Sequence, residues 1–134
     1  MLVVALLLSG LARAADLQVE VENVRNGRGA VRVTVCPRAD FLQPHCPWSA
    51  SVPARAPAVS VTVHDIPPGV YAVQAHHDEN GNGRIDRNLL GMPTEGIGFS
   101  RDAPFRFGPP SFADAAIALP EAGARIVLRL RYFS

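Results

Sequence analysis

The chain has 134 residues, which fits one domain with a single modest core. Its basic residues are all Arg, and thirteen of them stand against twelve acidic residues, for a formal net charge of +1. This near-equal balance of charges argues against binding to nucleic acid or to an anionic membrane surface, since both partners favour a basic patch.

Residues 1–14 have the composition of a secretory leader. An almost unbroken apolar run from Leu2 to Leu8 precedes Ala12-Arg13-Ala14, which fits the small-x-small pattern of a cleavage site. The run is shorter than the about 20 apolar residues that cross a bilayer as a helix, so we expect no transmembrane segment in the mature protein. We predict export to the periplasm or the medium and a mature domain of residues 15–134. A buried N-terminal helix is the alternative.

Alternation of apolar and polar residues dominates the mature chain and is typical of half-buried antiparallel strands. The runs are 17–22, 31–35, 59–63, 71–75 and 126–132, with a weaker one at 115–119. Asn26-Gly27-Arg28-Gly29 predicts a hairpin turn, because Asn-Gly tolerates positive φ, and Pro67-Pro68-Gly69 breaks the chain before the fourth run. The sequence therefore predicts an all-β fold, an antiparallel β-sandwich of about seven strands.

Two long segments interrupt the alternation. Residues 37–58 contain five prolines, so we expect a loop or a protected edge there. Cys36 and Cys46 predict a disulfide that ties this segment to the strand ending at Cys36. A redox pair is the alternative, although the spacing is not C-x-x-C. Residues 87–111 are rich in Gly and Pro yet carry seven large apolar residues, which predicts an ordered loop packed on the sandwich, either covering a sheet end or serving a function.

Residues 78–86 follow the oxygen spacing of an EF-hand calcium loop. The positions that normally supply ligands are filled in order by Asp78, Asn80, Asn82, the carbonyl of Arg84, and Asp86, with Gly83 at the sharp turn. Leu89 occupies the position of the usual bidentate acid. The pattern therefore predicts a weak Ca²⁺ site, which Glu95 or Asp102 of the following loop would complete.

Two other interpretations of this stretch stay open. Asp, Asn and Gly tolerate positive φ and cap their own backbone, so the loop could be a metal-free turn. A transition metal at His76 and His77 is the other, but neighbours on a strand point to opposite faces. His77 shares the parity of Tyr71 and Val73, which predicts a hydrogen-bonded histidine at the edge of the core.

Signs of catalysis are few. No serine lies in a G-x-S-x-G context, no phosphate-binding loop of the Walker or Rossmann type occurs, and spacing assigns no acid-base pair. We therefore expect that the protein is not an enzyme.

Four motifs resemble those of a family of small exported bacterial proteins classed as a domain of unknown function. They are Pro-Gly-x-Tyr-x-Val at 68–73, His-Asp-x-Asn-x-Asn-Gly-x-x-Asp at 77–86, Gly-x-Pro-x-Glu-Gly-x-Gly-Phe-Ser at 91–100 and Phe-Gly-Pro-Pro-Ser-Phe at 107–112. The resemblance covers essentially the whole mature chain. It implies an exported protein with an immunoglobulin-like or transthyretin-like sandwich and no established activity.

Together these features predict a non-enzymatic envelope interaction module with Ca²⁺ at residues 78–86 and an unidentified envelope protein or glycan as its partner. The alternative is a metal-free module whose loops 37–58 and 87–111 form an apolar groove for a carbohydrate or a peptide.

Overall fold

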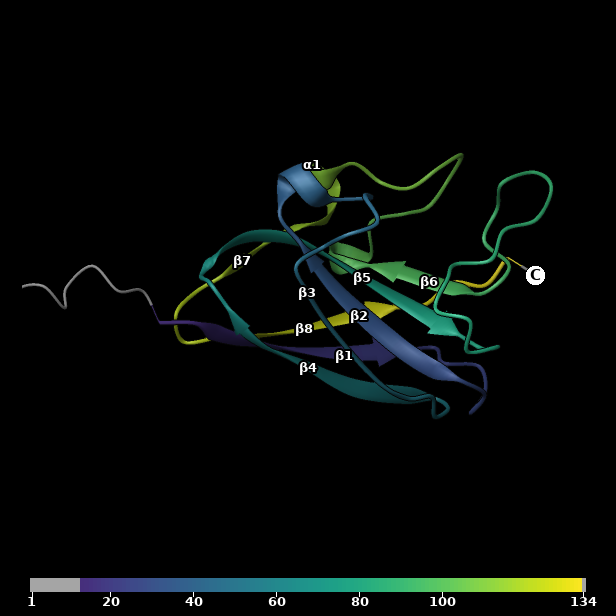
Figure 1. The fold of residues 1–134 in the computed structure, drawn as a ribbon, viewed down its shortest axis with the longest axis horizontal. Coiled ribbons are helices and arrows are strands. Elements are labelled where there is room, and N and C mark those ends of the chain that lie inside the picture. Colours follow the sequence, from purple (N-terminus) through teal and green to yellow (C-terminus); the bar gives the residue numbers. More distant parts are fainter. Residues whose placement is uncertain (1–12, 134) are drawn as a thin grey trace, which may run out of the picture.

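The computed structural model describes residues 13–133 and forms two packed β-sheets (Figure 1). The predicted leader, residues 1–14, lies outside the described residues except for its last two. The three-stranded sheet has the order β4 (Ala58–Ile66), β1 (Ala15–Glu22) and β8 (Ala124–Arg129). The five-stranded sheet has the order β3 (Trp48–Pro53), β2 (Ala30–Cys36), β5 (Gly69–Asp78) and β6 (Gly96–Phe99), and β7 (Ala116–Leu119) also pairs with β5. The predicted all-β sandwich is confirmed.

The main core lies between the two sheets, where the alternating apolar positions meet. On β1 every second residue is buried, and Val19 pairs with Val61 of β4 on one side and with Ile126 of β8 on the other. The opposite sheet contributes the inward residues of β2 and β5. Each such side chain, fully buried, stabilises the fold by about 1.5–3 kcal/mol relative to exposure. The fully buried members of both sheets include Leu17, Val19, Val21, Val31, Val33, Val35, Val61, Val73, Ala75 and Leu128.

The turn at 26–29 does not form the predicted hairpin. Its local chemistry is as expected, since Asn26 Oδ1 accepts a hydrogen bond from the Arg28 N–H at 2.9 Å and Gly29 has φ +67°. The flanking strands, however, belong to different sheets, so the turn crosses the sandwich. β1 pairs antiparallel with β4 and parallel with β8. The hairpin prediction is wrong because a turn motif fixes the local backbone and leaves open which strands pair.

Both irregular segments contain one strand that alternation did not predict. β3 lies in the first segment and forms the edge beside β2, which agrees with the protected edge expected there. β6 lies in the second and pairs Gln74 with Phe99. In its sequence, Gly-Ile-Gly-Phe, the two glycines disfavour a strand, although Ile97 and Phe99 favour one. Gly98 is needed because a Cβ there would lie 2.6 Å from the Arg129 carbonyl oxygen.

A second apolar layer covers the outer face of the five-stranded sheet. The Phe41 ring lies edge-to-face against Phe99 and Phe112, with centroids 6.1 and 6.0 Å apart. Phe105 and Ala72 of β5 belong to the same cluster. Parts of both segments therefore pack on the sandwich, as predicted for residues 87–111.

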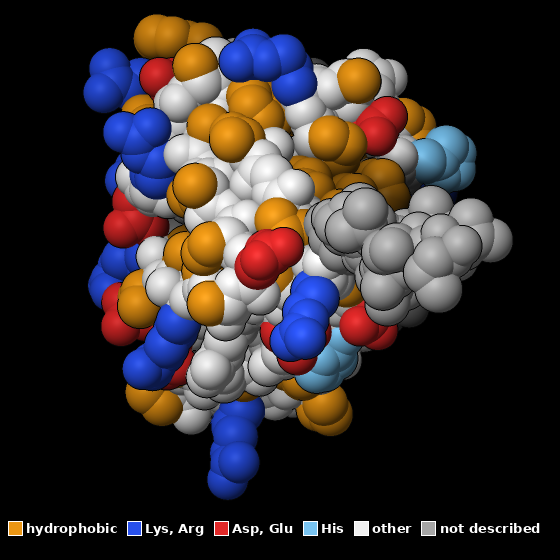
Figure 2. Space-filling model, turned by 90° about the vertical axis from the view of Figure 1, so that its left-hand side faces the viewer, with side chains coloured by type: hydrophobic (Ala, Val, Ile, Leu, Met, Phe, Trp, Pro, Cys, Tyr) orange, Lys and Arg blue, Asp and Glu red, His pale blue; other side chains and the backbone are white. Residues whose placement is uncertain are grey.

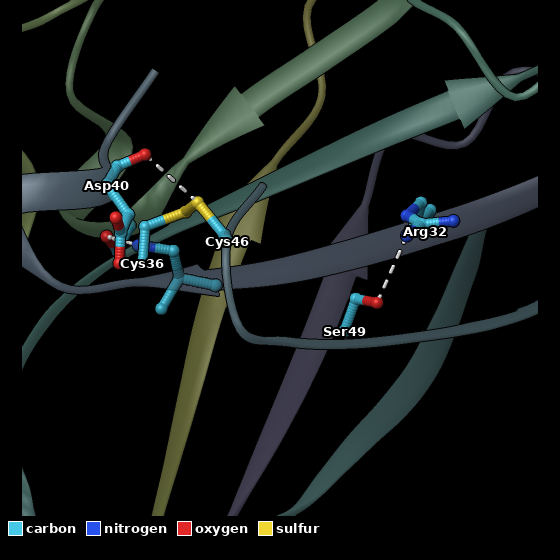
Figure 3. Close-up of a disulfide and its surroundings, with 7 residues drawn as sticks. Arg32, Cys36, Asp40, Cys46 and Ser49 are labelled. Carbon is cyan, nitrogen blue, oxygen red and sulfur yellow. Dashed lines mark hydrogen bonds between the residues drawn. A yellow bond between two sulfur atoms is a disulfide. The ribbon is translucent and has the colours of Figure 1, made fainter. Parts of the chain in front are cut away.

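The predicted disulfide joins Cys36, the last residue of β2, to Cys46 (Figure 3). Cys46 Sγ lies 3.3 Å from the Asp40 carbonyl oxygen. Because neither sulfur of a disulfide carries a hydrogen, this is a polar contact and not a hydrogen bond. The crosslink holds residues 37–46 over the outer face, where Phe41 is buried.

Charges are mixed on the face shown in Figure 2, where Arg and acidic side chains lie next to one another along one edge. Among the described residues the longest helix is a single turn, α1 (Phe112–Ala115), and no helix has the length and apolar character needed to cross a bilayer.

Candidate metal centre and adjoining cleft

β5 carries the two histidines to opposite faces of its sheet. His77 points into the sandwich and is fully buried. Its Nε2 donates to the Arg28 carbonyl oxygen at 2.7 Å, and its Nδ1 is hydrogen-bonded to the Tyr132 hydroxyl at 2.8 Å, as the acceptor when the ring is neutral. Both nitrogens are used. The prediction of a hydrogen-bonded core histidine is confirmed, and His77 is unsuited to hold a metal together with His76.

The last residue of β5, Asp78, organises the start of the predicted calcium loop. Its carboxylate accepts hydrogen bonds from the backbone N–H groups of Asn82 at 3.2 Å and Gly83 at 2.7 Å. Gly83 has φ +75°, a conformation that a residue without Cβ adopts at no steric cost. The loop therefore curls around the carboxylate of Asp78, a residue that is only 9% exposed.

Glu95 enters the loop from the other side, one residue before β6. Its Oε2 accepts from the backbone N–H groups of Glu79 at 2.7 Å and Asn80 at 3.3 Å. Its Oε1 lies 3.2 Å from His76 Nε2. Asp102, the other acid predicted to complete the shell, instead accepts from the Arg129 N–H at 3.0 Å. Of the two candidate acids, only Glu95 contacts the loop.

Asp86 sits opposite two amide side chains. Asn80 Nδ2 donates to it at 2.7 Å, and Asn82 Nδ2 donates to its two oxygens at 2.9 and 3.1 Å. These donors, Asn82 first, lower the pKa of Asp86, because they stabilise the ionised carboxylate. The amide oxygens accept from the N–H groups of Asn82 and Arg84. The amide nitrogens, not the oxygens, thus face Asp86, and a cation bound there would require both amides to turn.

A buried triad combines Asp78 of this loop with His76 and with Glu95, the acid that contacts the loop from outside it. One nitrogen or oxygen atom each of His76, Asp78 and Glu95 lie within 4.8 Å of one another, and all three residues are buried. Mixed imidazole and carboxylate donors suit a transition metal, whereas the loop oxygens suit Ca²⁺. From the sequence, His76 is a candidate ligand only together with His77. The signal for the triad is the shared parity of His76 and Asp78, which places both on one face of β5.

Two adjoining clefts of about 330 and 310 Å³ lie on the outer face of the five-stranded sheet, beside the triad. The disulfide-bound segment and the residues after Gly83 form opposite walls, and His76 lines the end nearest the loop. The residues common to both clefts are Leu42, Gln43, Pro44, Gln74, Ile85 and Arg87. Of the predicted groove loops, residues 42–46 and parts of 87–111 contribute, whereas β3 does not.

Two guanidinium groups at this cleft have neutral hydrogen-bond acceptors. Arg32 Nη2 donates to Ser49 Oγ at 3.1 Å (Figure 3), and Arg87 Nη1 donates to the Gly91 carbonyl oxygen at 3.1 Å. Neither forms a salt bridge within residues 13–133, and no Asp or Glu lines either cleft. The cleft therefore combines positive charge with amide and apolar walls.

Comparison with known proteins gave one match. Neither curated proteins nor solved structures yielded any similar chain. The model of a family described as an uncharacterized protein conserved in bacteria (DUF2141) matches residues 19–127. This span contains the 78–86 loop, Glu95 and both cysteines. The chain therefore belongs to this bacterial family, as its motifs predicted.

Proposed function

We propose that the protein is an exported, non-enzymatic envelope interaction module that holds Ca²⁺ at residues 78–86, with Glu95 in place of the absent acid at position 89. The observation that supports this most is the position of Glu95. Its buried carboxylate comes from a separate segment, accepts hydrogen bonds from the loop N–H groups of Glu79 and Asn80, and has an oxygen within 4.8 Å of one of Asp78.

Electrostatics favour a cation in this arrangement. Asp78, Asp86 and Glu95 bring three carboxylates to one short loop. Like charges at close range repel one another, and a bound cation would offset that repulsion in addition to the N–H donors already on these oxygens. Ca²⁺ takes six to eight hard oxygens. Three carboxylates, the Arg84 carbonyl and the two amides after rotation supply enough of them. A site built of so few acids belongs with the extracellular modules, with Kd about 10⁻⁴–10⁻³ M.

Thermal and urea unfolding with Ca²⁺, Mg²⁺, Zn²⁺ and chelator test the proposal. At one hundred times its Kd, Ca²⁺ should raise the free energy of unfolding by about 2.7 kcal/mol. Asp78→Asn should abolish the increase and Asp102→Asn should keep it. No increase at millimolar Ca²⁺, or an equal one in Asp78→Asn, would count against calcium. Stabilisation by Zn²⁺ alone that is lost in His76→Gln would assign the triad to a transition metal instead.

Export is compatible with the disulfide, because such bonds persist in oxidising compartments. The proposal places the module in the cell envelope, in contact with an envelope protein or glycan. Fractionation of cells that express the full chain should recover it outside the cytoplasm, shortened by 14 residues. Recovery of the unshortened chain from the cytoplasm would contradict this part of the proposal.

The cleft favours a second candidate function, a metal-free carbohydrate- or peptide-binding module. Arg32 and Arg87, with neutral acceptors only, suit a ligand that carries a carboxylate. A binding screen in chelator should then find acidic sugars or peptides with a free carboxyl terminus, and not their neutral or amidated counterparts. Arg32→Gln should weaken that binding, whereas Arg125→Gln, on the other sheet, should not.

A further inference from the structure

The segment between the calcium-type loop and β6 is a small hairpin. Thr94 N–H donates to the Asp86 carbonyl at 2.8 Å, and Asn88 N–H donates to the Met92 carbonyl at 2.9 Å. At the tip Asn88 Oδ1 accepts from the N–H groups of Leu90 at 2.9 Å and Met92 at 3.1 Å. The tip is therefore a turn with a defined conformation.

This turn exposes its apolar side chains. Leu89 is fully exposed and Leu90 is 87% exposed, whereas Met92 packs against the outer apolar layer. A turn held by Asn88 gains nothing from leucines that face water, because polar residues fill such positions equally well. The prediction that this segment packs on the sandwich is wrong at Leu89 and Leu90, and also at Phe107.

A second exposed apolar tip lies nearby. Phe107, between η3 (Ser100–Asp102) and α1, is fully exposed. Ile85 and Arg87, at the base of the hairpin, line the same cleft as Phe105 and Pro109, so the bases of both tips lie on the outer face of the five-stranded sheet. Figure 1 shows the two connections extending beyond the strands.

Within the two tips the charge differs from the even balance of the whole chain, although acids (Asp86, Glu95, Asp102 and Asp114) stand directly at their bases. Residues 87–94 contain Arg87 and no acid, and residues 103–113 contain Arg106 and no acid. Apolar side chains flanked by arginine match the interface of an anionic bilayer, where the side chains reach the acyl boundary and the guanidinium groups meet lipid phosphates.

We propose that Leu89, Leu90 and Phe107 insert into an anionic lipid bilayer and hold the protein at a membrane surface. The two tips are narrow and convex, and a fluid bilayer admits separate protruding side chains without a preformed pocket. Binding of this kind scales with the apolar area inserted and with attraction to anionic lipid. The inference goes beyond the proposed function and needs no bound cation, and of the cleft residues it uses only Arg87.

Cosedimentation with vesicles tests it. The processed protein is mixed with vesicles of phosphatidylcholine alone or with a third of phosphatidylglycerol, each in Ca²⁺ and in chelator. We expect binding to the anionic vesicles in both media. A Leu89→Ser, Leu90→Ser variant should bind at least about tenfold more weakly. Because both leucines are exposed, it should unfold at the same urea concentration as the parent protein.

Val127→Ser is the matched control, since Val127 is half-exposed on β8 and lies away from both tips. It should bind as the parent does. A Leu90→Trp variant should show a blue shift of its emission on anionic vesicles that exceeds any shift from the native Trp48. Failure of the parent protein to bind, or equal binding by the double serine variant, would overturn the proposal.

Discussion

The Glu95 carboxylate accepts a 2.7 Å hydrogen bond from the backbone N–H of Glu79, and this contact joins two segments that are sixteen residues apart. The same carboxylate meets His76 at 3.2 Å. Glu95 thereby fixes the position of the 78–86 loop relative to β6 and brings a third acid close to Asp78 and Asp86. Whether that acid stabilises the fold depends on whether a cation is present.

Replacing Glu95 with Gln should change stability in opposite directions in the two media. In chelator the change removes one charge from a cluster of acids and keeps an acceptor for the Glu79 N–H, so we expect a neutral to slightly stabilising effect. In saturating Ca²⁺ the variant loses a ligand and should be less stable than the parent by about 1–3 kcal/mol. Urea unfolding in both media measures this. An equal loss in both would assign Glu95 a purely structural role.

The ion pair of Arg25 and Glu79 should contribute to stability at neutral pH and not in acid. Arg25 donates from Nη2 at 2.6 Å and from Nε at 3.1 Å to the two Glu79 oxygens. These bonds, followed by one from Asn26, lower the pKa of Glu79 below its usual 4.5. The unfolded chain therefore binds more protons near pH 4, and the contribution is complete above the unfolded pKa and is lost as pH falls through the folded one.

Glu79→Gln should accordingly flatten the stability profile between pH 6 and pH 3, as measured by urea unfolding. The expected difference is about 1 kcal/mol at pH 7, since Arg25 is partly exposed and solvent screens the pair. Glu121→Gln, at an exposed position, serves as the control and should keep the slope of the parent protein. An unchanged slope in Glu79→Gln would show that other acids, such as Asp86, account for the acid sensitivity.

Loss of the disulfide should destabilise the protein by about 2.5–3 kcal/mol in the chain-entropy model for a short loop. Reduction frees residues 37–46, and Phe41 then has less to hold it against Phe99 and Phe112. Urea unfolding with and without a thiol reductant measures the loss. A Cys36→Ala, Cys46→Ala variant should unfold at the same urea concentration whether or not the reductant is present. If reduction leaves the unfolding midpoint in place, the aromatic contacts alone hold the segment.

Much of the sandwich could be predicted from alternation, because burial of every second residue is a local property of a strand. Pairing is not local. β1 and β8 are parallel neighbours although more than one hundred residues separate them, and no turn motif encodes that relationship. β6 could not be predicted from strand propensity, because two of its four residues are glycines. Gly96 lies close to the Tyr132 ring and Gly98 lies close to the Arg129 backbone, and neither position has room for a Cβ.

The candidate site divides in the same way. The oxygen spacing of 78–86 lies within one turn, so the sequence displays it directly. The choice between Glu95 and Asp102 depends on how β6 pairs with β5, which spacing does not reveal. The triad can be predicted only if β5 is known to continue to Asp78, because only then do His76 and Asp78 lie on one face of a strand. The exposure of Leu89 and Leu90 cannot be predicted from composition, which does not distinguish the tip of a hairpin from its stem.

Gly29→Ala should be far more damaging than Gly81→Ala, although both residues have nearly the same positive φ, +67° and +69°. A Cβ at Gly81 meets no atom within 4 Å, so its replacement incurs only the strain of the left-handed conformation, about 1 kcal/mol. A Cβ at Gly29 would lie 1.9 Å from the Asp78 carbonyl oxygen, where the inter-sheet turn crosses the end of β5. The backbone must then shift at the base of the candidate metal loop, which should add at least about 2 kcal/mol to the loss of stability.

Urea unfolding of both variants in chelator isolates this difference from cation binding. Equal losses would mean that the turn and the loop separate without cost, and the contact between them would then play no part in positioning Asp78.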